Sequence, residues 1–135
     1  MSLLNVQNLS LSIFDAEILK NINLRIESGQ IVAVVGESGS GKSMTSNALM
    51  QLLPEGTKSD GSIWLNDDQD LLKITEAEMC EVRKTKIGMI FQEPMKALNP
   101  LETIGAQVIE AIKLTEPGLT RIQYIEKAEI VLHRV

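Results

Sequence analysis

The sequence predicts an α/β fold that opens with an antiparallel pair of strands. Three observations carry this prediction. Apolar residues alternate through the first thirty positions, as they do in half-buried strands. An uninterrupted β-branched run then covers 31–35, which is typical of a strand buried in a parallel sheet. The second half of the chain contains segments with helical spacing, so strands and helices are mixed along one domain-sized sequence of 135 residues.

The alternation divides the first segment into two strands joined by a short reversal at 15–17. Lys20 interrupts the apolar pattern of the second strand. The apolar residues that we expect to share a face are Leu9, Leu11 and Ile13 in the first strand, and Ile18, Ile22, Leu24 and Ile26 in the second. Because the reversal is so short, we expect the two strands to pair antiparallel.

A phosphate-binding loop follows the run at 31–35. Residues 36–43 match the complete pattern G-x-x-x-x-G-K-[ST], and 44–53 read as a helix that ends before Pro54 and Gly56. The glycines let the backbone N–H groups turn inward around a polyphosphate. Lys42 supplies a positive charge for the outer phosphates, and Ser43 offers a hydroxyl to the accompanying Mg²⁺. The expected nucleotide-binding residues of this segment are Gly36, Glu37, Ser38, Gly39, Ser40, Gly41, Lys42, Ser43 and Met44.

Two alternatives to this motif are weak. A random chain of this length would match the pattern roughly once in two hundred, and the strand before and helix behind reduce that chance further. A dinucleotide-binding G-x-G-x-x-G pattern would need a third glycine where Met44 stands. The sequence therefore predicts binding of a nucleoside triphosphate with Mg²⁺.

The remaining elements alternate in type. Strands are expected at 61–65 and 87–91, and a loop with two prolines at 92–100. Helices are expected over 75–85, over 104–112 with an end before Pro117, and from Thr120 to the last residue. Capping-box sequences open the first and the third of these helices, at 75–78 and 120–123.

Composition narrows the function classes. The net charge of −5 gives no general electrostatic reason to bind nucleic acid. Cys80 is the single cysteine, which fits a reducing cytoplasm, and no apolar stretch approaches the ~20 residues that span a bilayer. We therefore expect any role at a membrane to come through a partner protein.

Two later segments resemble a known family. The strand-like 87–91 ends in Gln92, and 92–100 reads Gln-Glu-Pro-Met-Lys-Ala-Leu-Asn-Pro, which is similar to the Q-loop of ABC transporter ATPases. The residues at 36–43 and 90–101 are similar to those of the branch of this family that serves oligopeptide, dipeptide and nickel importers. The resemblance covers essentially the whole chain. It implies ATP as the nucleotide, Gln92 as a contact to Mg²⁺ and the attacking water, and Phe14 as the aromatic that stacks on adenine.

The resemblance also implies an architecture and partners. We expect a P-loop NTPase (RecA-like) core with an N-terminal antiparallel β subdomain over 1–92, and the Q-loop with the start of a helical subdomain over 93–135. The loop after Gln92 would touch membrane permease subunits, which places the protein at the inner face of the cell membrane. A second ABC ATPase subunit would complete the ATP site.

Several family motifs do not occur in these 135 residues: the Leu-Ser-Gly-Gly-Gln signature, an apolar run ending in Asp-Glu, and a switch histidine after a strand. Glu93 reads as a loop carboxylate rather than a catalytic base, and His133 as a solvated helix residue. We therefore expect a truncated, N-terminal half of the family pattern with no catalytic residue of its own and no useful ATP turnover. A non-catalytic nucleotide-binding fragment and a non-transport ABC ATPase remain the alternatives.

Overall fold

The computed structural model describes residues 2–93 and 97–135. Contacts between Cα atoms divide the chain into two compact units, Met1–Cys80 and Glu81–Val135, and each is described by itself. The division after Cys80 separates two compactly packed parts of the chain. The expected functional boundary after Gln92 stays a prediction.

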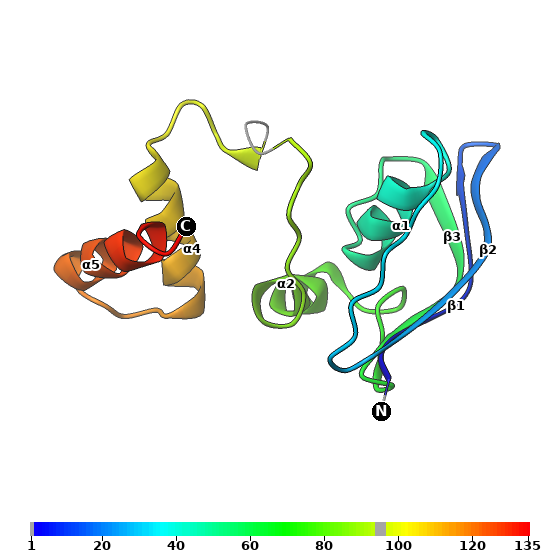
Figure 1. The fold of residues 1–135 in the computed structure, drawn as a ribbon, viewed down its shortest axis with the longest axis horizontal. Helices are drawn as coiled ribbons and strands as arrows, with labels where there is room; N and C mark the ends of the chain where they lie inside the picture. The colour runs from blue at the N-terminus through cyan, green and yellow to red at the C-terminus, as the bar shows by residue number, and fades with distance from the viewer. Residues whose placement is uncertain (1, 94–96) are drawn as a thin grey trace. The chain divides into compact units, whose positions relative to one another are not determined.

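An antiparallel sheet forms the frame of the first unit (Figure 1). Its strands are β1 (Ser2–Ile13), β2 (Ala16–Glu27), β3 (Thr57–Leu65) and β4 (Gln69–Asp70), in the order β2-β1-β3-β4. Both neighbours of β1 run antiparallel to it, as β4 does to β3. The expected pairing of the first two segments is confirmed, and the expected strand at 61–65 begins four residues earlier, at Thr57.

A bulge in β2 changes which of its residues face the core. In β2, Leu19 is 2% exposed while Ile18 lies at the surface, which corrects the prediction that Ile18 shares a face with Ile22, Leu24 and Ile26. The strand pairing explains the difference: Leu11 pairs with Leu19 but Leu9 pairs with Ile22, so two residues of β1 face three of β2. The extra residue lies beside Asn21, whose φ is 49°, and it moves the inward-facing positions from odd to even numbers.

The two strands predicted at 31–35 and 87–91 are not formed. Both segments are extended chain outside the sheet, and Ile31 and Ile90 are 101% and 99% exposed. A strand is held by hydrogen bonds to a neighbouring strand, however apolar its own sequence is. Among residues 2–93 and 97–135, the paired strands are those of the antiparallel sheet, so these two segments have no ladder to join.

The positions of the helices were predicted correctly from local sequence patterns. The helices are α1 (Lys42–Leu49), α2 (Glu76–Thr85), α4 (Ile104–Thr115) and α5 (Arg121–Leu132). The expected helix after the P-loop ends at Leu49 instead of residue 53, because Gln51 takes a left-handed φ of 48° directly after the last turn. Within the part of the chain that the structure describes, no helix has the length and apolar character to cross a bilayer.

Both predicted capping boxes are present. The Thr75 N–H and hydroxyl donate to the Glu78 carboxylate at 2.8 and 2.7 Å, and these bonds lower the pKa of Glu78. At α5, the Thr120 N–H donates to the Gln123 amide oxygen at 2.8 Å while the Gln123 N–H reaches the Thr120 hydroxyl. Each box satisfies N–H groups that a helix start otherwise leaves without partners.

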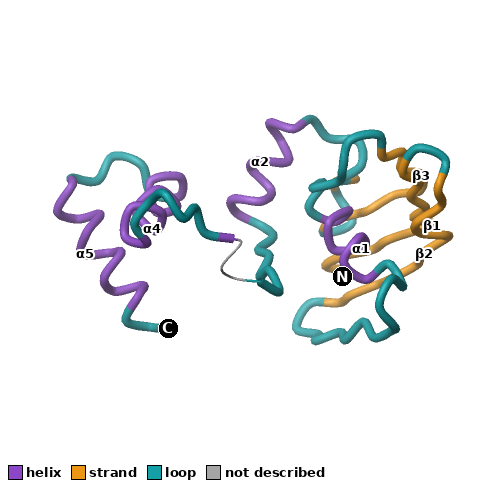
Figure 2. Tube along the Cα trace, turned by 90° about the horizontal axis from the view of Figure 1, so that it is seen from above, coloured by secondary structure: helices purple, strands orange, loops and turns teal. Residues whose placement is uncertain are grey.

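Each unit has its own apolar interior. In the first, α1 lies along one face of the sheet (Figure 2), and Ala48 of that helix is 0% exposed. The strands contribute Val6, Leu9, Leu11, Leu19 and Ile63 to the buried set. In the second, α4 packs beside α5, and Tyr124 and Ala128 of α5 are buried. The sheet and α1 are the elements that position the candidate site.

Candidate nucleotide-binding site

The P-loop makes a tight turn between Val35 and α1. Gly39 and Gly41 adopt left-handed φ angles of 82° and 90°, which only glycine takes without strain. The Ser40 N–H donates to the Glu37 carbonyl at 3.2 Å and closes the turn. A Cβ on Gly36 would lie 2.6 Å from the Ser40 hydroxyl, so the loop closes tightly on itself where the motif requires its first glycine.

The Lys42 ammonium lies inside this loop. Its Nζ donates to the carbonyl oxygens of Gly36 at 2.8 Å and Glu37 at 2.6 Å, and lies 3.2 Å from the Ser40 hydroxyl. The helix start fixes the backbone of Lys42, and the loop carbonyls fix its side chain. A positive charge is thereby held against two backbone carbonyls of the loop.

The N-terminus of α1 points its positive end into the same loop. Gly41 is the N-cap, no side chain caps this end, and the first turn contains no acidic residue. The helix dipole at this end is therefore not offset by a protein carboxylate, and it favours an anion. Ser43 lies exposed in the first turn and Met44 is half-buried beside it.

These features of the loop fit a nucleoside triphosphate. The loop offers one fixed ammonium and a helix terminus that no protein carboxylate offsets, which together suit a polyanion. The Ser43 hydroxyl is the residue here that could ligate Mg²⁺, with phosphate oxygens as the other ligands. A protein-only metal site does not occur in the described ranges, where no cluster of three His, Cys, Asp or Glu side chains could hold a metal ion.

The β1–β2 turn lies at the same end of the first unit as the P-loop (Figure 1). A Cβ on Gly41 would lie 2.4 Å from the Leu19 side chain, so the end of the loop packs directly on β2. Phe14 is at the tip of this hairpin and is 71% exposed. The structure thus brings an accessible aromatic ring to the P-loop end of the sheet.

Gln92 lies in the second unit, at the surface. Together with Phe91, Glu93 and Ala97 it lines a cavity of about 390 Å³. Its expected roles, contact to Mg²⁺ and to the attacking water, stay predictions. Residues 94–96 of the loop after Gln92 fall outside the described residues.

Asp70 is a buried carboxylate that the sequence did not single out. Burial alone would raise its pKa, but N–H bonds from Ile63 at 3.0 Å and Leu72 at 3.2 Å, together with Lys73, lower it overall. The Lys73 ammonium lies 2.9 Å from the other carboxylate oxygen as an ion pair. These contacts join β3 to β4, so the role of Asp70 is to hold the sheet edge.

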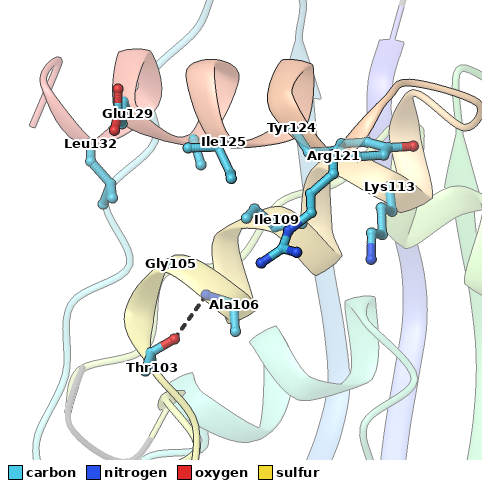
Figure 3. A pocket seen from close by; sticks show the side chains of 11 residues that line it. Thr103, Gly105, Ala106, Ile109, Lys113, Arg121, Tyr124, Ile125, Glu129 and Leu132 are labelled. Atoms are coloured by element: carbon cyan, nitrogen blue, oxygen red, sulfur yellow. Dashed lines mark hydrogen bonds between the residues drawn. The ribbon is translucent and has the colours of Figure 1, made fainter.

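A cavity of about 810 Å³ lies between α4 and α5 (Figure 3). Apolar residues such as Ile109, Ile125 and Leu132 line it, and Lys113 lies 5.7 Å from the centre of the Tyr124 ring at one end. The helix start beside it is capped by the Thr103 hydroxyl, which accepts from the Ala106 N–H at 3.2 Å. This groove has no phosphate-binding loop, so the P-loop is the better candidate for the nucleotide.

Comparison with known proteins agrees with this geometry. The family described as ABC transporter matches residues 19–135, which include the P-loop and the segment after Gln92. A probable peptide ABC transporter ATP-binding protein, y4tR of Sinorhizobium fredii, is 37% identical over 138 residues, covering 98% of this chain and 41% of that protein. The oligopeptide transport ATP-binding protein AppD of Bacillus subtilis is 44% identical over 117 residues, covering 82% of this chain and 35% of its own length.

A third relative extends the pattern. The probable D,D-dipeptide transport ATP-binding protein DdpD of Escherichia coli is 42% identical over 120 residues, which is 84% of this chain and 36% of DdpD. The chain spans about two fifths or less of the length of these curated relatives.

Proposed function

Because this chain belongs to the ABC transporter family, we propose that its P-loop binds ATP as the energy-coupling site of an importer for peptides or a related small solute. One observation carries the proposal: the Lys42 ammonium is held among the carbonyls of the P-loop at the uncapped start of α1. The loop carbonyls that hold the Lys42 ammonium carry no net charge, and the triphosphate of ATP would supply the opposite charge.

Each residue has a distinct part in this proposal. The amides of 36–43 and the α1 terminus bind the phosphate oxygens. Lys42 neutralises charge on the outer phosphates, and Ser43 ligates Mg²⁺, which supplies further charge neutralisation when bound. Phe14 stacks on the adenine ring, and Gln92 responds to the bound nucleotide and its Mg²⁺.

The partners are proposed from the relatives. Three relatives carry peptide, oligopeptide or dipeptide transport in their names, and a fourth, GsiA of Salmonella typhimurium, is named a glutathione import ATP-binding protein. We propose that this chain serves a solute of that kind, or nickel, through permease subunits that contact the loop at 92–100. It would then sit at the cytoplasmic face of the membrane, paired with a second ATPase subunit and without nucleic acid.

The 135 residues would bind ATP without useful turnover. The motifs that position the attacking water and complete a partner's site do not occur in this sequence. A phosphate-release assay beside an ATP-binding titration tests this directly. Binding with turnover above the level of the Lys42→Ala variant contradicts it.

The test of the site is Lys42→Ala, with Lys20→Ala as the matched control. Lys20 is an exposed lysine of β2 whose ion pair with Glu17 is long, at 3.6 Å, so its loss removes one positive charge outside the loop. We expect Lys42→Ala to weaken binding of Mg·ATP by about 10- to 100-fold, the value of one or two charge-assisted hydrogen bonds. Lys20→Ala should change it little.

Equilibrium titration with a labelled Mg·ATP analogue measures both affinities, and circular dichroism confirms that the variants are folded. Equal affinity of folded Lys42→Ala and of the unaltered chain would show that the P-loop is not the binding site.

A further inference from the structure

Phe14 is held in an unusual backbone conformation. Its φ is 51°, in the left-handed region that non-glycine residues rarely adopt. The Phe14 N–H donates to the carbonyl of Gly56 at 3.1 Å, and this bond joins the β1–β2 turn to the segment that precedes β3. The conformation of the hairpin tip is therefore supported by a residue from a distant part of the sequence.

The ring of Phe14 also lies against Gly56. A Cβ built on Gly56 would lie 2.8, 3.0 and 3.1 Å from three carbons of that ring, closer than atoms pack. Gly56 itself has a φ of 79°, which disfavours any side chain. Two independent features, the ring contact and the backbone angle, thus require glycine at this position.

Sheet pairing places Gly56 there. Ile13, directly before Phe14, pairs with Thr57, directly after Gly56. Gly56 lies in a tight turn, in which the Thr57 hydroxyl donates to the Pro54 carbonyl at 2.7 Å. Because the sheet and the bond to Pro54 fix Thr57, the Gly56 α-carbon is held against one side of the Phe14 ring.

We propose that Gly56 is a positioning residue for the nucleobase: it supports the Phe14 ring from one side and leaves the rest of the ring open to stack on the base. This rests on the proposed function, in which Phe14 receives adenine. The ring is 71% exposed despite the contact, so a large part of it is available to a ligand.

The chemistry of this contact is stacking, which every purine can provide. The recognised ligand class is a purine nucleoside triphosphate, held by its phosphates at the P-loop and by its base on Phe14. Stacking contributes about a two- to tenfold gain in affinity. Inorganic tripolyphosphate has no base and would gain nothing from Phe14 or Gly56.

The experiment compares Gly56→Ala with Gly29→Ala. Gly29 has the same φ of 79° but no atom within 4 Å of an added Cβ, so its variant reproduces the backbone strain without the ring contact. Each variant is titrated with Mg·ATP and with inorganic tripolyphosphate. We expect Gly56→Ala to lower ATP affinity by about two- to tenfold and to leave tripolyphosphate affinity unchanged, while Gly29→Ala changes neither.

A double-mutant cycle then tests whether Gly56 acts through Phe14. In a Phe14→Ala background, Gly56→Ala should have no further effect on ATP affinity. An equal loss in both backgrounds, or an equal loss for ATP and tripolyphosphate, would overturn the positioning role. If the unaltered chain binds tripolyphosphate but ATP no more tightly, the P-loop function survives and the base contact fails. If it binds neither, the proposed function itself fails.

A measurement on the unaltered chain guards against a Gly56→Ala variant that does not fold. Nuclear Overhauser effects between the Gly56 α-protons and the Phe14 ring should be present, and ATP should shift the Phe14 ring and Gly56 amide resonances. Tripolyphosphate should leave those two sets in place while it shifts the P-loop amides. Identical shifts at Gly56 with both ligands would contradict the proposal.

Discussion

Single side chains in this protein act by holding backbone groups in place. Lys42 joins the carbonyls of Gly36 and Glu37, and Asp70 joins the N–H groups of Ile63 and Leu72. Lys42 could be singled out from the sequence because it belongs to one contiguous motif, and its role toward phosphate stays a prediction. The roles of Asp70 and Gly56 could not, because each depends on a partner that only the sheet pairing brings near.

Asp70 gives the first prediction, on the pH dependence of stability. Its pKa in the folded protein lies below its ordinary value of 3.8, so its charge stabilises the fold above that pH, and the contribution is lost as pH falls through the folded pKa. Asp70→Asn keeps an acceptor for both N–H groups but removes the charge. We expect it to lower the free energy of unfolding by about 1–2 kcal/mol at pH 7, the difference between charged and neutral hydrogen bonds, because exposed Lys73 adds little.

Urea unfolding from pH 7 downward measures this difference, with Asp68→Asn as an exposed control that should behave like the unaltered protein. The gap between Asp70→Asn and the unaltered chain should narrow below about pH 4. A gap of constant size over the whole range would show that charge is not the cause.

Among the elements, helices could be predicted more fully than strands. Capping boxes and helical spacing are local, and all four described helices α1, α2, α4 and α5 occur where the sequence placed them. Strands depend on partners elsewhere in the chain. The apolar runs at 31–35 and 87–91 therefore resembled strands without becoming strands, and the bulge at Asn21 reversed an otherwise regular alternation.

The α2 capping box gives a second prediction. Thr75→Ala should lower the free energy of unfolding by about 1 kcal/mol, because it leaves a first-turn N–H without its acceptor. Thr75→Ser should restore most of this loss, since serine caps equally well. Thr85→Ala, at the other end of the same helix, removes a hydroxyl that donates to the Glu81 carbonyl and serves as control.

Nuclear magnetic resonance adds an independent readout of the box. Without the Thr75 hydroxyl, the pKa of Glu78 should rise toward its ordinary value of 4.5, because part of what lowers it is gone. A Glu78 pKa unchanged in Thr75→Ala would mean that the hydroxyl does not contribute.

At the scale of the whole molecule, the family assignment and the P-loop class predicted from the sequence are confirmed by the match over residues 19–135. The surface was harder to predict. The run at 31–35 is separated from β2 by three residues, and Ile31 and Val35 are 101% and 88% exposed. Exposed apolar chain of this kind favours association between copies.

That exposure gives a third prediction. The double substitution Ile31→Thr with Val35→Thr should raise the concentration at which the chain begins to aggregate, while the free energy of unfolding changes by less than about 0.5 kcal/mol. Ile31→Val with Val35→Ile keeps the apolar character and is the matched control. Light scattering over a concentration series reports the onset. The idea fails if the threonine variant and the control aggregate alike.

The seating of Gly41 on Leu19 has a geometric consequence. One strand, β2, supports the P-loop at Leu19 and begins at Ala16, two residues after Phe14. In the proposed function this strand therefore fixes the distance between the phosphate site and the base site. The proposed site would therefore select ligands by their length. A nucleotide whose base-to-terminal-phosphate span differs from the separation of the two sites can engage one of them but not both.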